Sequence, residues 1–102
     1  MKQIERIQYM EQILDEASLT IQNLTDELSS YCSLLPRLKE LASYYESPLW
    51  VKDFEDDENH LLPEDLKRGV LSQDAVYDLL SKQDELLLSM DSLIQAIKNE
   101  RS

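Results

Sequence analysis

The sequence predicts an all-α protein, in which two long heptad-patterned helices form a hairpin or bundle and are joined by a short-helix connector. Residues that favour helix, such as Leu, Glu and Gln, are abundant. The chain has only one glycine and three prolines, the residues that turns most often require. Apolar residues also recur at alternating spacings of three and four near both ends. We expect one helical domain over 1–102: a long helix at 2–46, a folded connector at 47–71 and a second long helix at 72–100.

The first helix carries the most regular pattern. Apolar side chains occupy every seam position of its heptad repeat: Ile7, Met10, Leu14, Ala17, Ile21, Leu24, Leu28, Tyr31, Leu35, Leu38, Ala42 and Tyr45. Ile13, Leu34 and Leu41 fall at flanking positions and widen the stripe. Such a stripe is typical of helices that pack along their length as coiled coils or bundles.

Pro36 interrupts this helix, because its ring removes one backbone hydrogen bond and meets the carbonyl of Cys32. Ser33 could instead cap a new helix that holds Pro36 in its first turn. The heptad register continues through Pro36, so we expect a kinked, nearly continuous helix.

The last third repeats the pattern with one polar exception, Gln83. Its seam is Val76, Leu79, Gln83, Leu86, Met90, Leu93 and Ile97, flanked by Leu80, Leu87 and Ile94. Ser72 is the predicted N-cap, with Asp74 in the first turn. Lys98 and Arg101 suit the negative end of the helix dipole.

The connector begins at Ser47-Pro48, which should end the first helix because the residue before proline avoids helical geometry. Leu49, Trp50, Val51 and Phe54 supply apolar surface for packing. The run Pro63 to Gly69 is expected to form a short helix, with Gly69 in the left-handed terminal conformation.

The two long helices differ in length. At about 1.5 Å per residue, the first spans roughly 65 Å and the second roughly 42 Å. An antiparallel pair would leave about 20 Å of apolar stripe uncovered on the longer helix. The connector, a fold at Pro36 or a second subunit could cover it, and we expect a homo-oligomer, most simply a dimer, or another helical partner.

The net charge of −11 disfavours nucleic-acid binding, because like charge repels phosphate backbones. Mimicry of DNA by exposed acidic helix faces is a remote alternative. No apolar run is long enough to cross a bilayer. Cys32 has no cysteine partner in the chain, which fits a reducing compartment, so we expect a cytoplasmic protein.

An acidic segment runs from Asp53 to Asp65. Asp53, Glu55, Asp57 and Glu64 occupy the first, third, fifth and twelfth places of an EF-hand-like loop, and such carboxylates bind Ca²⁺ or Mg²⁺. Glu58, however, stands where that loop needs glycine. We favour a solvated acidic surface without cofactor over this metal site.

No catalytic constellation is present. His60 is the only histidine, and Cys32 has no evident base beside it, so we interpret them as a loop residue and a small apolar residue. Trp50, Tyr44, Tyr45, Phe54 and Tyr77 could line a recognition pocket, but packing of the connector against the helices explains them slightly better.

The segment from Tyr44 to Leu80 resembles a known family. Tyr44-Tyr45-Glu46-Ser47, Trp50, Asp53 and Asp57-Glu58 carry the likeness, and above all Leu-Pro-Glu-Asp-Leu-Lys-Arg-Gly-Val-Leu-Ser-Gln-Asp-Ala-Val-Tyr at 62–77. These residues are similar to the Domain of Unknown Function 4298 family of small cytoplasmic bacterial proteins. The resemblance implies a helical protein with no assigned activity. Family members often carry glycine near the position of His60.

These observations favour a non-enzymatic protein–protein interaction module that self-associates through its heptad faces. The residues that we predict to make contacts are Trp50, Asp53, Asp57, Lys67 and Arg68. The alternative is a small divalent-cation-dependent enzyme or ligand-binding protein, which would require Asp53, Asp57 and Glu64 to converge in one cleft.

Overall fold

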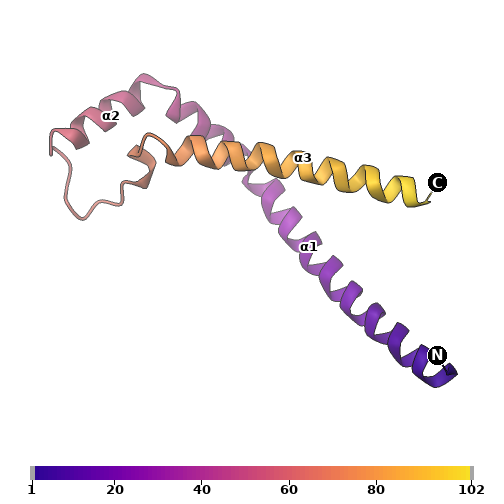
Figure 1. Ribbon diagram of the computed structural model, residues 1–102. Helices are drawn as coiled ribbons and strands as arrows, with labels where there is room; N and C mark the ends of the chain where they lie inside the picture. The colour runs from indigo at the N-terminus through magenta and orange to yellow at the C-terminus, as the bar shows by residue number, and fades with distance from the viewer. Residues whose placement is uncertain (1, 102) are drawn as a thin grey trace. The chain divides into compact units, whose positions relative to one another are not determined.

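The computed structural model describes residues 2–101, and this part of the chain contains helices and no strand. In chain order the elements are α1 (Gln3–Tyr45), α2 (Pro48–Glu58), the short 3₁₀ helix η1 (Gly69–Leu71) and α3 (Ala75–Arg101) (Figure 1). The prediction of an all-α fold is therefore confirmed. The chain divides into two units, Met1–Leu38 and Lys39–Ser102.

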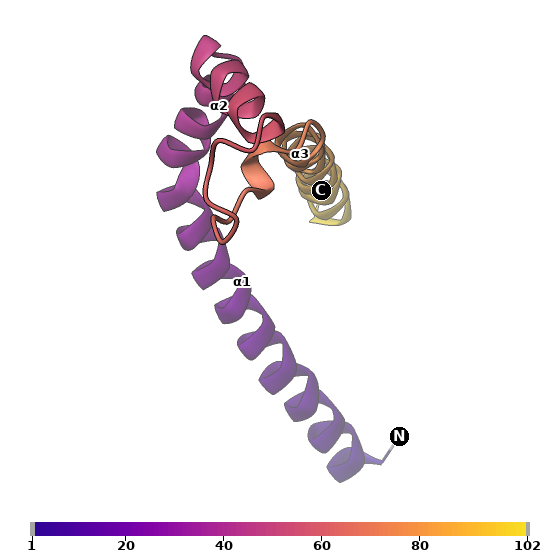
Figure 2. The same cartoon turned by 90° about the vertical axis from the view of Figure 1, so that its left-hand side faces the viewer.

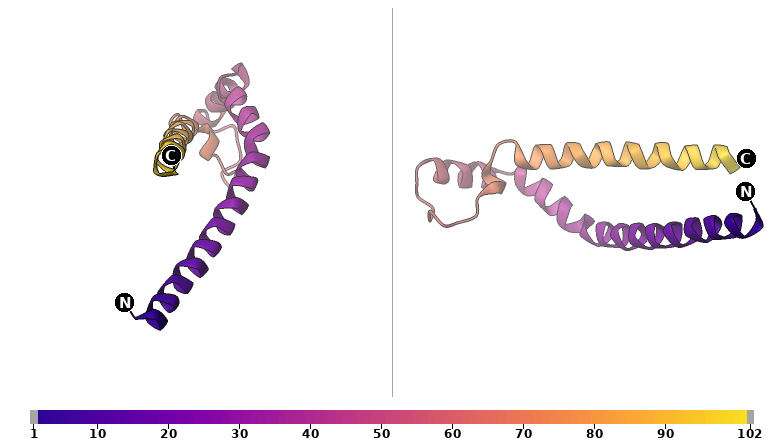
Figure 3. Two further views of the ribbon diagram at one scale, coloured as in Figure 1. Left: turned by 90° about the vertical axis from the view of Figure 1, so that its right-hand side faces the viewer. Right: turned by 60° about the horizontal axis from the view of Figure 1, so that its bottom comes forward.

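Helix α1 runs through Pro36 without a break (Figure 3). The prediction of a nearly continuous helix is confirmed, and Ser33 does not begin a new one. Proline costs one helical hydrogen bond, but the apolar register that continues on both sides of it gives the helix one packing face.

The first unit consists of the α1 residues up to Leu38. We call the apolar heptad positions of this part, from Ile7 to Leu38, the α1 seam. A single helix has no other element within its unit to cover such a seam. Accordingly Leu14, Ile21 and Leu24 are 58%, 65% and 62% exposed.

The second unit begins with the last turns of α1, and Ser47-Pro48 separates α1 from α2 as predicted. Ser47 is the N-cap of α2 with extended backbone, and Pro48 is its first helical residue. The Ser47 amide and hydroxyl both donate to the carbonyl of Tyr44, at 3.0 and 2.6 Å, so this acceptor at the end of α1 is satisfied.

The end of α2 is a Schellman motif. The amide of Leu61 donates to the Asp56 carbonyl at 2.9 Å, and the amide of His60 donates to the Asp57 carbonyl at 3.0 Å. His60 has a φ of 58°, the left-handed conformation that this motif needs at the residue after the C-cap. The left-handed residue was predicted at Gly69, and that prediction is wrong, because Gly69 does not have a positive φ.

The predicted helix from Pro63 to Gly69 is also wrong. The segment up to Arg68 belongs to a loop between α2 and η1 (Figure 2), and Gly69 begins η1. Glu64 and Asp65 form a turn within this loop. The Leu66 amide donates to the Pro63 carbonyl at 3.2 Å, which closes the turn. A seven-residue helix is marginal by itself, and here the Arg68 side chain bonds the carbonyls of Pro63 and Leu66.

Helix α3 starts later than predicted. Ser72 follows η1 with extended backbone, and Asp74 takes the N-cap place, since its carbonyl accepts the amide of Asp78 at 2.8 Å. Lys98 and Arg101 lie in the last turn, as expected.

Among residues 2–101 only Leu71 and Val76 are buried, at 6% and 3% exposure, so the core lies where η1 meets α3.

Candidate interaction surface

Three aromatic rings pack together where the end of α1, helix α2 and η1 meet. The ring of Trp50 lies 5.3 Å from that of Tyr45, edge to face, and 5.2 Å from that of Phe54, in a stack. The Trp50 indole N–H donates to the Val70 carbonyl at 2.9 Å, and the Tyr45 hydroxyl donates to the Gln73 carbonyl at 2.8 Å. Both polar tips are therefore satisfied while the rings pack, as aromatic residues at such positions require.

The other two aromatic candidates lie outside this stack. Tyr77, on α3, is 63% exposed. The half-buried Tyr44 points its hydroxyl to Asp53 of α2 and donates to the carboxylate at 2.6 Å. This hydrogen bond, together with burial and the charge of Asp53, raises the pKa of Tyr44 to about 12.

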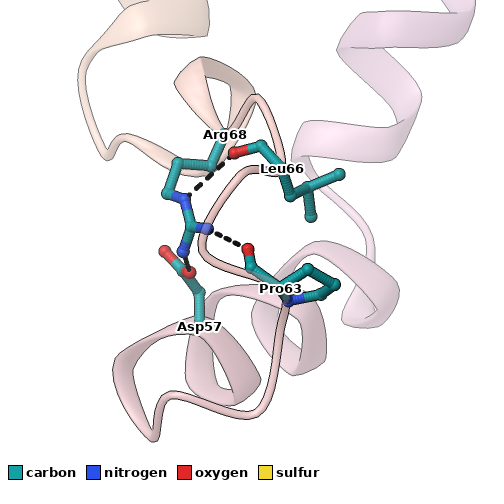
Figure 4. A network of polar contacts seen from close by, with 4 residues as sticks. All are labelled: Asp57, Pro63, Leu66 and Arg68. Atoms are coloured by element: carbon teal, nitrogen blue, oxygen red, sulfur yellow. Dashed lines mark hydrogen bonds and ion pairs between the residues drawn. The ribbon is translucent and has the colours of Figure 1, made fainter.

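The Arg68 side chain links the loop that follows α2 to α2 itself, an arrangement that we call the Arg68 clasp. Its guanidinium forms an ion pair with the Asp57 carboxylate and donates to the carbonyls of Pro63 and Leu66 (Figure 4). Side-chain exposure is 35% for Arg68 and 17% for Asp57. One planar cation thus satisfies acceptors from α2 and from two points of the loop, for which the several donors of arginine are suited.

The four carboxylates considered for a metal site have different surroundings. Asp53 accepts from Tyr44 and Asp57 pairs with Arg68, whereas Glu55 and Glu64 are exposed. Within the described residues, no group of three or more His, Cys, Asp or Glu side chains is placed to hold a metal ion. The neighbouring Asp56 pairs with Lys52 at 3.1 Å, one helical turn away.

The residues predicted to make partner contacts mostly serve the fold. Trp50, Asp53, Asp57 and Arg68 all bond within the second unit, and Lys67 is exposed on the loop. The backbone carbonyls that accept their hydrogen bonds, such as that of Val70, cannot be predicted from a sequence pattern. His60 and Cys32 are both exposed.

A family model, described as a domain of unknown function (DUF4298), matches residues 7–93. The chain belongs to this family. The match covers all of α2 and η1 and most of α1 and α3, and it includes the aromatic stack and the Arg68 clasp. His60 holds a left-handed backbone within the matched segment, a conformation that glycine adopts without strain.

Neither the comparison with curated proteins nor that with solved structures gives a match. In the part of the chain that the structure describes, no helix has both the length and the apolar character needed to cross a membrane.

Proposed function

We propose that this protein is a non-enzymatic interaction module that self-associates through the α1 seam. The observation that carries the proposal is the exposure of most of that seam, which is apolar at every heptad position from Ile7 to Leu38; only Tyr31 and Leu38 are half-buried. Monomeric proteins rarely expose a long contiguous apolar stripe, and such stripes mark interaction sites. A second copy of the chain is the simplest partner, because it brings a seam of the same period.

The second unit supports the proposal because its aromatic and charged side chains bond to one another and to the backbone of the same unit. The aromatic stack and the Arg68 clasp are bonded within the unit and give the connector a fixed form. The alternative of a cation-dependent enzyme has less support, since Asp53 and Asp57 have other partners. Cys32 has no cysteine partner in the chain, which fits a reducing compartment. The cytoplasm is therefore the proposed place of action.

The experiment compares two leucines of α1 by light scattering during size-exclusion chromatography. Leu24 lies on the seam and Leu19 on the opposite face, with similar exposures of 62% and 64%. A seam charge must lose its water in the interface, whereas a charge on the outer face stays solvated. We expect about twice the monomer mass for wild type and Leu19→Asp, and a shift toward monomer for Leu24→Asp. Equal masses for all three proteins would contradict the proposal.

A further inference from the structure

We propose that two copies of the chain pair antiparallel along the α1 seam, with the two-fold axis between Gln22 and Asn23. This inference rests on the proposed self-association and adds the direction of pairing. In this register the overlap extends from Ile7 to Leu38, which is the whole seam of the first unit. Side-chain size and the flanking residues each favour this direction over a parallel, in-register pair.

Side-chain size matches across the antiparallel seam. Ala17, the one small residue of the seam, lies opposite the partner's Leu28, and Tyr31, its largest, lies opposite the partner's Leu14. A parallel pair would place Ala17 against the partner's Ala17 and leave a void, which is destabilising. It would also crowd the two Tyr31 rings in one layer. Complementary layers therefore favour the antiparallel pair.

The flanking residues on one side of the seam also match. Ile13 and Leu34 are 44% and 40% exposed at the same heptad position. Antiparallel helices place equal flanking positions side by side, so Ile13 would pack on the partner's Leu34. In a parallel pair Ile13 would instead face Ser18, and Leu34 would face Lys39. Only the antiparallel direction covers both apolar side chains with apolar neighbours.

Charge does not decide the direction. Glu11, Asp15 and Glu16 form an acidic block. The antiparallel register places this block opposite residues 29–34, which carry no charge, but only two residues from the partner's Glu27. A parallel pair would gain an Arg6–Glu11 pair at the exposed edge, and exposed ion pairs stabilise little.

Disulfide cross-linking tests the direction. In a Cys32→Ser background, Ala17→Cys and Leu28→Cys are prepared as separate proteins, mixed, oxidised and analysed by intact mass spectrometry. Facing seam positions are close enough for a disulfide. We expect the mixed Ala17→Cys/Leu28→Cys dimer in large excess over either homodimer. Gln12→Cys, on the outer face, replaces Ala17→Cys as a control and should give no mixed dimer.

Each other outcome overturns the inference in a distinguishable way. Homodimers of both variants without the mixed species would establish parallel pairing, while self-association stands. A dimer by light scattering without any seam disulfide would place the interface elsewhere on the chain. A monomer by light scattering would contradict the proposed function itself, independently of the direction of pairing.

Discussion

Single polar side chains join the elements of the second unit. Tyr44 bonds Asp53 across the α1–α2 corner, Trp50 bonds the backbone of η1, and Arg68 holds the loop to α2. Each of these groups is only partly buried, so each contributes modestly, about 1 kcal/mol for a hydrogen bond of this kind. The form of the connector therefore depends on several such bonds rather than on one.

Tyr44→Phe should lower the free energy of unfolding by about 1 kcal/mol at neutral pH, because it removes a hydrogen bond to a charged group at a part-exposed site. The folded state raises the pKa of Tyr44 from 10.0 to about 12, so it binds this proton more tightly than the unfolded chain does. The advantage of wild type is therefore full below pH 10 and is lost as the pH rises toward 12.

Urea denaturation of wild type and Tyr44→Phe at fixed protein concentration measures this difference. Tyr77→Phe is the control, because Tyr77 is mostly exposed and its removal should change stability little. A gap between wild type and Tyr44→Phe that grows above pH 10 would contradict the assigned hydrogen bond.

At the scale of helices and loops, the sequence predicts what local chemistry determines. The heptad period predicts both long helices, and Ser47-Pro48 predicts the boundary between α1 and α2. The segment from Pro63 to Gly69 could not be predicted in this way. Its conformation depends on the Arg68 guanidinium, which reaches Asp57 eleven residues earlier. Local propensity contains no information on such a contact.

The end of α2 provides a test at this scale. His60 holds a left-handed backbone, which costs a residue with a side chain roughly 1–2 kcal/mol. His60→Gly should therefore raise the free energy of unfolding by about 1 kcal/mol, after the greater freedom of glycine in the unfolded chain is subtracted. Thermal and urea unfolding of the variant measure the gain.

Asn59→Gly is the matched control, since Asn59 has a φ of −87° and gains nothing from glycine. We expect this variant to be slightly less stable than wild type. A His60→Gly protein that is no more stable than Asn59→Gly would show that His60 is not strained.

At the scale of the whole chain, the candidate site was predicted only in part. Among the residues singled out from the sequence, Tyr45, Trp50 and Phe54 pack together, whereas Lys67 and Tyr77 are exposed. Several of the partners are backbone carbonyls. The α1 seam was visible in the sequence, since an uninterrupted apolar heptad series needs no tertiary information. The partner that covers a seam cannot be identified without tertiary information, because the same stripe suits a second copy of the chain or another helix.

Sedimentation equilibrium of the wild-type protein over a range of concentrations, with and without millimolar Ca²⁺ or Mg²⁺, tests self-association most directly. We expect a dimer mass at high concentration, dissociation on dilution and no dependence on either cation. A mass of one chain, 11.9 kDa, at every concentration would contradict it. A change in mass that appears only with the cation would instead favour the acidic connector as the functional site.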